Sequence, residues 1–220
     1  MELLYTAHVP AGPGPFSSVV ALHGWGASAH DLFGLAPILD AGRSLVLSPQ
    51  GPVAFPIAQG VPGYGWFDLT RGGPPNPSEI KQAADLVDGF LTAAAERYPI
   101  DPRKQVLLGF SQGGVVAYEL ALRDPSRFAG LIALSSWLPE ELVSGAGSPR
   151  LENLPVFVSH GTEDPMIPIE RGRESKERLT NLGALLTYRE YEMQHEILPD
   201  ALRDMVRWLD EKALNPIQLV

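Results

Sequence analysis

The chain has 220 residues, of which 45% are hydrophobic and 20% are charged, and its 17 basic and 26 acidic residues give a formal net charge of −9. This balance is typical of one soluble globular domain, and the acidic charge, which no run of lysines or arginines offsets, makes nucleic acid and anionic membrane surfaces poor partners. Because cysteine is absent, disulfide frameworks, thiolate metal sites and a cysteine nucleophile are excluded.

The amino-terminal residues do not have the pattern of a secretion signal. Residues 1–15 contain no basic side chain, and three prolines interrupt their short apolar stretch. No apolar run elsewhere approaches the ~20 residues that a membrane-spanning helix needs. We therefore expect a cytoplasmic protein without stable membrane insertion, in which residues 1–220 form a single domain.

Short runs of strand-forming residues alternate with helical patterns along the chain. This alternation predicts an α/β protein, with βα units around a mostly parallel and buried central sheet flanked by helices. The first strand lies at a sheet edge, and the predicted strands cover residues 2–7, 18–22, 44–48, 105–110, 131–135, 156–160 and 185–191.

The clearest helix covers residues 80–98, where apolar side chains recur with the spacing of one helix face. Asn76 precedes it as a cap, and Glu79 stands at the capping-box position. Gly183 is a predicted stop for a later helix. Residues 51–77 have no clear period and predict a long loop, which in a compact domain is usually functional or mobile. Further helices are predicted to follow Gln112, Glu170 and Leu198.

The strongest chemical signal is Gly109-Phe110-Ser111-Gln112-Gly113, a G-x-S-x-G motif between a predicted strand and a predicted helix. A serine held on a sharp strand-to-helix turn leaves no room for side chains two residues to either side, so the motif needs its glycines. Ser111 is therefore the predicted nucleophile. The alternative is a glycine-rich turn with an incidental serine.

A serine hydroxyl needs a base, and histidine is the usual one. The order of this motif's partners, serine then acid then histidine, leaves His160 and His195 as candidates. We favour His195 because it lies in a loop between the last strand and the last helix, although it could be an ordinary surface residue.

The acid should lie between the nucleophile and the base in the sequence. Asp164 is favoured because Pro165 holds it extended and its side chain is short. Glu163 is the alternative, and either acid could belong to a solvated turn.

Acyl transfer also needs donors for a developing oxyanion. The backbone N–H of Gln112 follows the nucleophile, and the N–H of Trp25 in the loop after an early strand is the second candidate. The same loop, Gly24-Trp25-Gly26-Ala27-Ser28-Ala29, matches the G-x-G-x-x-A dinucleotide fingerprint, which leaves a nucleotide-binding oxidoreductase as an alternative. Against this, Pro49-Gln50 follows the next strand where a ribose-binding acid should stand.

These motifs resemble the carboxylesterase and acyl-protein thioesterase group of α/β-hydrolases, the phospholipase/carboxylesterase family, and the similarity runs nearly from end to end. The form Gly-Phe-Ser-Gln-Gly-Gly is more specific than the bare pentapeptide. The motifs that carry the resemblance are Leu22-His23-Gly24-Trp25-Gly26, Asp31-Leu32-Phe33, Trp66-Phe67-Asp68, Gly109-Phe110-Ser111-Gln112-Gly113-Gly114, Leu134-Ser135-Ser136-Trp137-Leu138-Pro139, His160-Gly161-Thr162-Glu163-Asp164 and Gln194-His195.

The resemblance implies a small single-domain α/β-hydrolase with no separate cap domain, no cofactor and no metal. It implies that Ser111 is the nucleophile, His195 the general acid and base and Asp164 its orienter, with Trp25 and Gln112 as the oxyanion hole. The sequence departs from the family pattern at Ala27-Ser28 and at Ser136, which affects the expected pocket shape and not the bond-breaking residues.

The implied activity is hydrolysis of carboxylic esters with short to medium acyl chains through an acyl-enzyme. Lysophospholipase or acyl-(protein) thioesterase activity is the alternative with the same machinery, and a non-catalytic module with this fold stays open. The expected partner is a small acyl ester or lysolipid, and a homodimer is left open. Trp66, Phe67 and Trp137 are candidate pocket walls, or ordinary core aromatics.

Overall fold

The computed structural model describes residues 2–70, 73–144 and 150–215. Within these residues a seven-stranded sheet has the order β1-β3-β2-β6-β7-β8-β9. β1 pairs antiparallel with β3, and all other neighbours in this sheet are parallel. The predicted fold class is confirmed. The strands are β1 (Tyr5–His8), β2 (Phe16–Leu22), β3 (Leu45–Pro49), β6 (Ile100–Phe110), β7 (Gly130–Leu134), β8 (Pro155–Gly161) and β9 (Leu185–Tyr191).

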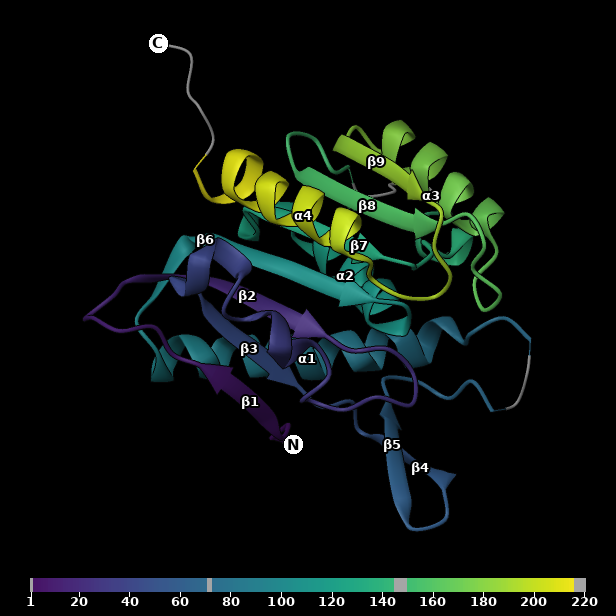
Figure 1. The fold of residues 1–220 in the computed structure, drawn as a ribbon, viewed down its shortest axis with the longest axis horizontal. Helices are drawn as coiled ribbons and strands as arrows, with labels where there is room; N and C mark the ends of the chain where they lie inside the picture. The colour runs from purple at the N-terminus through teal and green to yellow at the C-terminus, as the bar shows by residue number, and fades with distance from the viewer. Residues whose placement is uncertain (1, 71–72, 145–149, 216–220) are drawn as a thin grey trace.

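Helices cover both faces of this sheet, and Figure 1 shows α4 in front of it with α1 behind. Side chains of α1, α2 and α3 form the core on one face, whereas α4 and two 3-10 turns cover the other. Strands buried on both faces favour continuous apolar runs, and each fully buried aliphatic side chain contributes about 1.5–3 kcal/mol. The helices are α1 (Pro77–Arg97), α2 (Gln112–Arg123), α3 (Ile169–Asn181) and α4 (Pro199–Trp208).

The predicted elements lie close to where the sequence places them. The seven predicted strands are all present, with bounds that differ by a few residues. The Asn76 side chain accepts the Ser78 N–H at 3.0 Å and caps α1 as expected. Gly183 follows the end of α3 with φ of +83°, the left-handed conformation that a glycine stop supplies. No helix in the described ranges is both long and apolar enough to cross a membrane.

The prediction of a loop for residues 51–77 is wrong in its first half. β4 (Val53–Ala58) and β5 (Val61–Gly65) form an antiparallel hairpin that projects from the main sheet (Figure 1). Pro56 and Pro62 lie opposite each other in its register, and prolines inside a run argue against a strand when only the sequence is known. The hairpin adds structure beside the carboxyl ends of the parallel strands, where their connecting loops gather.

Candidate active site

Ser111 occupies a strained turn between β6 and α2. Its φ of 51° and ψ of −119° are rare for a residue with a side chain, and such a conformation costs roughly 1–3 kcal/mol. The N–H of Ser111 donates to the Leu134 carbonyl of the neighbouring strand at 2.9 Å. Ser136 Oγ donates to the Ser111 carbonyl at 2.7 Å. The strained turn is thus held at its N–H by Leu134, which ends β7, and at its carbonyl by Ser136, which follows that strand.

The glycines of the motif are required by contact with backbone atoms. A Cβ at Gly109 would lie 2.4 Å from the Gly114 nitrogen, and a Cβ at Gly113 would lie 2.0 Å from the Leu22 carbonyl oxygen. Side-chain carbons do not approach backbone so closely. Side chains at residues 109 and 113 would therefore clash with backbone, as the motif predicts, because β2 packs closely against the start of α2.

Asp164 and His195 meet across the ends of β8 and β9. Asp164 Oδ1 accepts the N–H groups of Met166 and Ile167, both at 2.8 Å. Its Oδ2 lies 2.7 Å from His195 Nδ1. An ionised carboxylate can only accept, so Nδ1 of His195 carries a proton, and in the neutral ring Nε2 would keep its lone pair. The Asp164 side chain is 0% exposed and the His195 side chain 19% exposed.

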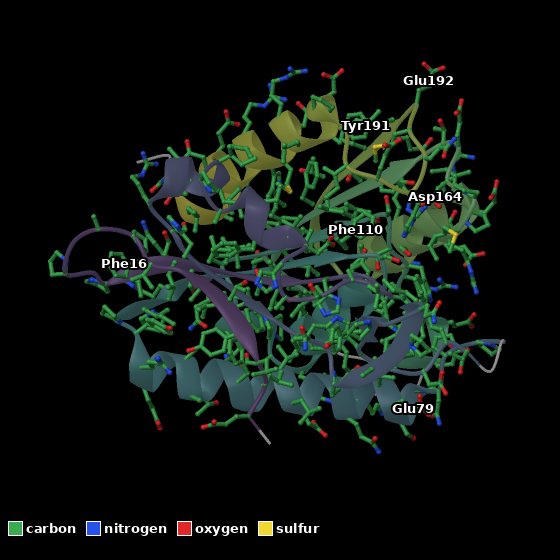
Figure 2. The ribbon with its side chains drawn as sticks, turned by 60° about the horizontal axis from the view of Figure 1, so that its bottom comes forward. Phe16, Glu79, Phe110, Asp164, Tyr191 and Glu192 are labelled. Carbon is green, nitrogen blue, oxygen red and sulfur yellow. The ribbon has the colours of Figure 1, made fainter. Side chains whose placement is uncertain are left out.

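The His195 ring lies beside the turn that carries Ser111. It packs against the ring of Phe110, the residue before Ser111, with the ring centroids 4.9 Å apart. Figure 2 labels Phe110 and Asp164 on the side of the molecule away from Phe16, which begins β2. The structure therefore gathers the three predicted residues at the carboxyl end of the sheet.

The two alternatives for the acid and the base lie elsewhere. Glu163 is exposed, and its N–H donates to the Met193 carbonyl at 3.2 Å. His160 is buried in β8, and its Nε2 lies 2.7 Å from the Ile167 carbonyl oxygen. The geometry pairs Asp164 with His195 and puts His160 behind them.

The loop after β2 passes directly beside the nucleophile turn. A Cβ at Gly24 would lie 3.3 Å from the Ser111 Cβ, so Trp25 begins next to this serine. Trp25 also stacks on Phe55 of β4, with centroids 3.9 Å apart. Gln112 is the first residue of α2, and N–H groups in the first turn of a helix have no partner within that helix. The two residues predicted to supply oxyanion donors therefore adjoin Ser111, and their role as donors stays a prediction.

The side chain of Gln112 has a role that the sequence does not reveal. Its Oε1 accepts the Trp66 N–H at 2.7 Å, and its Nε2 donates to the Phe67 carbonyl at 2.7 Å. A buried amide that satisfies two backbone groups in this way fixes the end of β5 against α2. The one signal in the sequence is the resemblance, since a glutamine at the start of a helix is otherwise unremarkable.

His23 ties the same loop to two neighbouring segments. Its Nε2 accepts the Gly51 N–H at 2.9 Å, so the proton is on Nδ1, which donates to the Gly24 carbonyl at 2.8 Å. The His23 carbonyl accepts Trp66 Nε1–H at 2.9 Å. Burial lowers the pKa of His23, and the nearby Gly24 carbonyl opposes this shift only in part. Nothing in the sequence motif points to this structural role of the His23 side chain.

The three predicted pocket aromatics are buried. Trp66, Phe67 and Trp137 are 2%, 1% and 8% exposed. A cavity of about 400 Å³ adjoins Trp66 and Phe67, and the rest of its wall comes from residues 52–53, Asp68 and the first turns of α1. Ser111 and His195 do not line it. The assignment of these aromatics to a substrate pocket stays a prediction.

The dinucleotide fingerprint has a different structural role. The loop of residues 24–29 leads to a 3-10 turn, Leu32–Leu35, where a nucleotide fold would begin the helix that binds the pyrophosphate. A Cβ at Gly24 would meet the Phe110 ring at 3.1 Å, so this glycine serves packing against β6. Among the described residues, no group of three or more His, Asp or Glu side chains could hold a metal ion.

Comparison with known proteins gives a consistent result. Residues 10–212 match the family model described as Phospholipase/Carboxylesterase. The chain is 30% identical over 230 residues to acyl-protein thioesterase 1 of Gibberella zeae, covering 94% of each chain. Esterase PE8 has a similar solved structure, with a TM-score of 0.82 and 26% identity over 96% of this chain and 100% of that one. The carboxylesterase of Bacillus cereus follows with a TM-score of 0.78 and 25% identity over 91% of both chains.

Proposed function

The chain belongs to the phospholipase/carboxylesterase family of α/β-hydrolases, and from this premise we propose that it is a single-domain serine hydrolase that cleaves carboxylic esters of short to medium acyl chains. One observation carries the proposal. His195 makes a 2.7 Å hydrogen bond to Asp164 and packs on Phe110, the residue before Ser111, which stands on a strained turn at a helix start. No structural requirement of the sheet explains such a turn and such a pair together.

In this mechanism His195 Nε2 takes the proton of Ser111 Oγ as that oxygen attacks the acyl carbonyl. Asp164 holds the Nδ1–H tautomer and stabilises the imidazolium that forms. The imidazolium then protonates the leaving alcohol, and the acyl group remains on Ser111. Water activated by His195 attacks the acyl-enzyme, which releases the acid and restores the serine.

The oxyanion of each tetrahedral intermediate is proposed to bind the N–H groups of Trp25 and Gln112. Removing one such donor typically costs ~3–4 kcal/mol of transition-state stabilisation. The hydrogen bonds of the Gln112 side chain and of His23 fix the two segments that carry these donors. Donors that are rigid before substrate arrives need no reorganisation during the reaction.

To test the nucleophile, hydrolysis of p-nitrophenyl butyrate is measured for the parent, for Ser111→Ala and for Ser126→Ala. Ser126 is a matched control because its hydroxyl donates only within its own turn, to Asp124. We expect Ser111→Ala to lose at least about 10³-fold in kcat. Ser126→Ala should retain parental activity. A fluorophosphonate should label the parent once and leave Ser111→Ala unlabelled, and equal rates for parent and Ser111→Ala would reject the proposal.

A thioesterase is the second candidate, and the name of the Gibberella zeae relative favours it. The same machinery would attack a thioester carbonyl. Matched oxygen and sulfur esters of the same acyl group, from acetyl to palmitoyl, distinguish a carboxylesterase from a thioesterase. A lysophosphatidylcholine series tests for lysophospholipase activity. A higher kcat/KM for thioesters at every chain length would replace the carboxylesterase proposal with the thioesterase one.

A further inference from the structure

A second histidine lies behind the Asp164–His195 pair. His160 of β8 has a side chain that is 0% exposed, and its Nε2 lies 2.7 Å from the carbonyl oxygen of Ile167. A carbonyl oxygen can only accept, so Nε2 carries the ring proton and donates it to Ile167. Nε2 is 3.6 Å from Asp164 Oδ2, which is too far for a good hydrogen bond.

The backbone of Ile167 is held at both of its polar groups. Its N–H donates to Asp164 Oδ1, and its carbonyl accepts from His160. Asp164 is therefore linked to the sheet through Ile167 as well as through its own chain. A movement of the His160 ring would shift Ile167 and with it the carboxylate that orients His195.

Helix α3 fixes the ring from the other side. A Cβ at Gly172 would lie 2.8 Å from Nδ1 and 2.9 Å from Cγ of His160, so only glycine lets the helix approach this closely. Glycine inside a helix is less favourable than alanine by about 1 kcal/mol. The close contact clamps the ring between α3 and the Asp164 loop.

The histidine ring has an energetic cost at this position as well as a hydrogen bond. His160 Nδ1 has no hydrogen-bond partner among the described residues. A buried polar atom without a partner costs about 1–3 kcal/mol, which opposes the stability gained from the bond to Ile167. Within the part of the chain that the structure describes, the hydrogen bond of this ring goes to Ile167 in the Asp164 loop.

We propose that His160 is a positioning residue, which sets the orientation of the Asp164 carboxylate toward His195 through the backbone of Ile167. This inference rests on the proposed function, in which Asp164 and His195 activate Ser111. His160 itself does not touch the substrate or the reacting atoms in this mechanism.

The first test compares two substitutions at this residue. His160→Leu removes the donor, whereas His160→Gln keeps an amide N–H at similar reach from the backbone. We expect His160→Leu to lower kcat about tenfold to a hundredfold, as small misplacements of catalytic groups do, with KM changed by less than about threefold. His160→Gln should recover most of that loss.

The second test compares two helix glycines. Gly172→Ala would force the His160 ring to move, whereas Gly89→Ala in α1 adds a methyl group with no atom within 4 Å. Both changes improve helix propensity by about 1 kcal/mol, so helix stability alone predicts the same outcome for both. We expect Gly172→Ala to lower kcat about tenfold, and Gly89→Ala to leave it unchanged.

A spectroscopic readout separates this inference from the proposed function. The strongly downfield proton of the His195 Nδ1–H bond to Asp164, assigned by its loss in His195→Gln, is followed by proton NMR without any substrate. It should move or disappear in His160→Leu and Gly172→Ala and stay in His160→Gln. An unmoved signal with unchanged kcat in both perturbing variants overturns the positioning role. A parent without Ser111-dependent turnover overturns the proposed function instead, and the NMR comparison still decides the role of His160.

Discussion

Two sides of the candidate site are built differently. The oxyanion side, residues 22–27, 65–67 and 112, is held by side-chain hydrogen bonds to backbone from Gln112 and His23, and both of these side chains are buried. On the acid–base side, residues 160–168 and 193–195, the buried Asp164 is held by two backbone N–H groups, whereas His195 is partly exposed and its ring is held by the bond to Asp164.

The difference matches what each side must do. Donors that stabilise a developing charge act best when they are fixed in advance, so redundant bonds suit the oxyanion side. A base that accepts a proton, gives it away and then activates water must reach solvent and keep some freedom. In the proposed mechanism the structure therefore fixes the donors and the acid in advance, and it leaves the base exposed where protons are exchanged.

The largest expected effect breaks the acid–base side. Asp164→Asn cannot stabilise the imidazolium and favours the wrong tautomer of His195, so kcat should fall about 10⁴-fold, as for the equivalent change in a serine protease. The matched control is Glu163→Gln, because this neighbouring acid is exposed. Steady-state kinetics of both variants check the prediction. A similar loss in Glu163→Gln would mean that the sides are misassigned.

The next prediction concerns the contact between the start of α2 and the end of β2. Gly113→Ala would place a methyl group 2.0 Å from the Leu22 carbonyl oxygen, and the free energy of unfolding should fall by about 3 kcal/mol, the upper end of the cost of overpacking. Gly34→Ala is the control, since no atom lies within 4 Å of its added carbon. Urea unfolding midpoints measure both. Equal midpoints for the two variants would show that the structure accommodates a methyl group at residue 113 without loss of stability.

A smaller effect tests the redundancy of the oxyanion side. Gln112→Met keeps the shape of the side chain but leaves the Trp66 N–H and Phe67 carbonyl without their partner, which should cost about 2 kcal/mol of unfolding free energy. The exposed Gln82→Met serves as the control and should change stability by less than about 0.5 kcal/mol. Denaturant titration distinguishes the two variants. A loss no larger than the control's would show that the Gln112 amide does not stabilise this side.

The smallest effect is a pH dependence at His23. Burial lowers its folded pKa, so unfolding takes up a proton between the unfolded value of about 6.5 and that lower value. The stability that His23 contributes is present above pH 6.5 and is lost as pH falls through the folded pKa. Between pH 7.5 and 5.5 the advantage of the parent over His23→Asn should shrink, because the unfolded chain binds the proton first. Unfolding free energies at both pH values measure it, and a constant difference would contradict the assignment.

Sequence patterns predict the parts of this molecule whose causes are local. The buried strands are predictable as continuous apolar runs because helices cover both faces of the sheet. The need for glycine at residues 109 and 113 is predictable because the serine turn leaves no room for a side chain there. Asp164, and not Glu163, is the acid that hydrogen-bonds His195, and its turn is stabilised by N–H bonds to Oδ1 that the sequence does not show.

Long-range hydrogen bonds account for what the sequence could not predict. The Gln112 side chain spans 46 positions to Trp66, and nothing in a helical pattern marks an amide for that contact. The hairpin was hidden because Pro56 and Pro62 obscure the strand pattern, and its pairing with residues 26–27 forms only in three dimensions. The sequence leaves His160 as a candidate base because its burial depends on how α3 packs, which no local pattern shows.

The hairpin has one anchored end and one free end. At its base, a Cβ at Gly65 would lie 2.2 Å from the Trp25 ring, and Tyr64 exchanges backbone hydrogen bonds with Gly26 and Ala27. At its tip, Gly60 has no neighbouring atom within 4 Å of an added carbon. Insertions or randomised libraries placed at the tip would therefore diversify the surface beside the site without moving the Trp25 loop. Changes at the base would move that loop and so would lower activity.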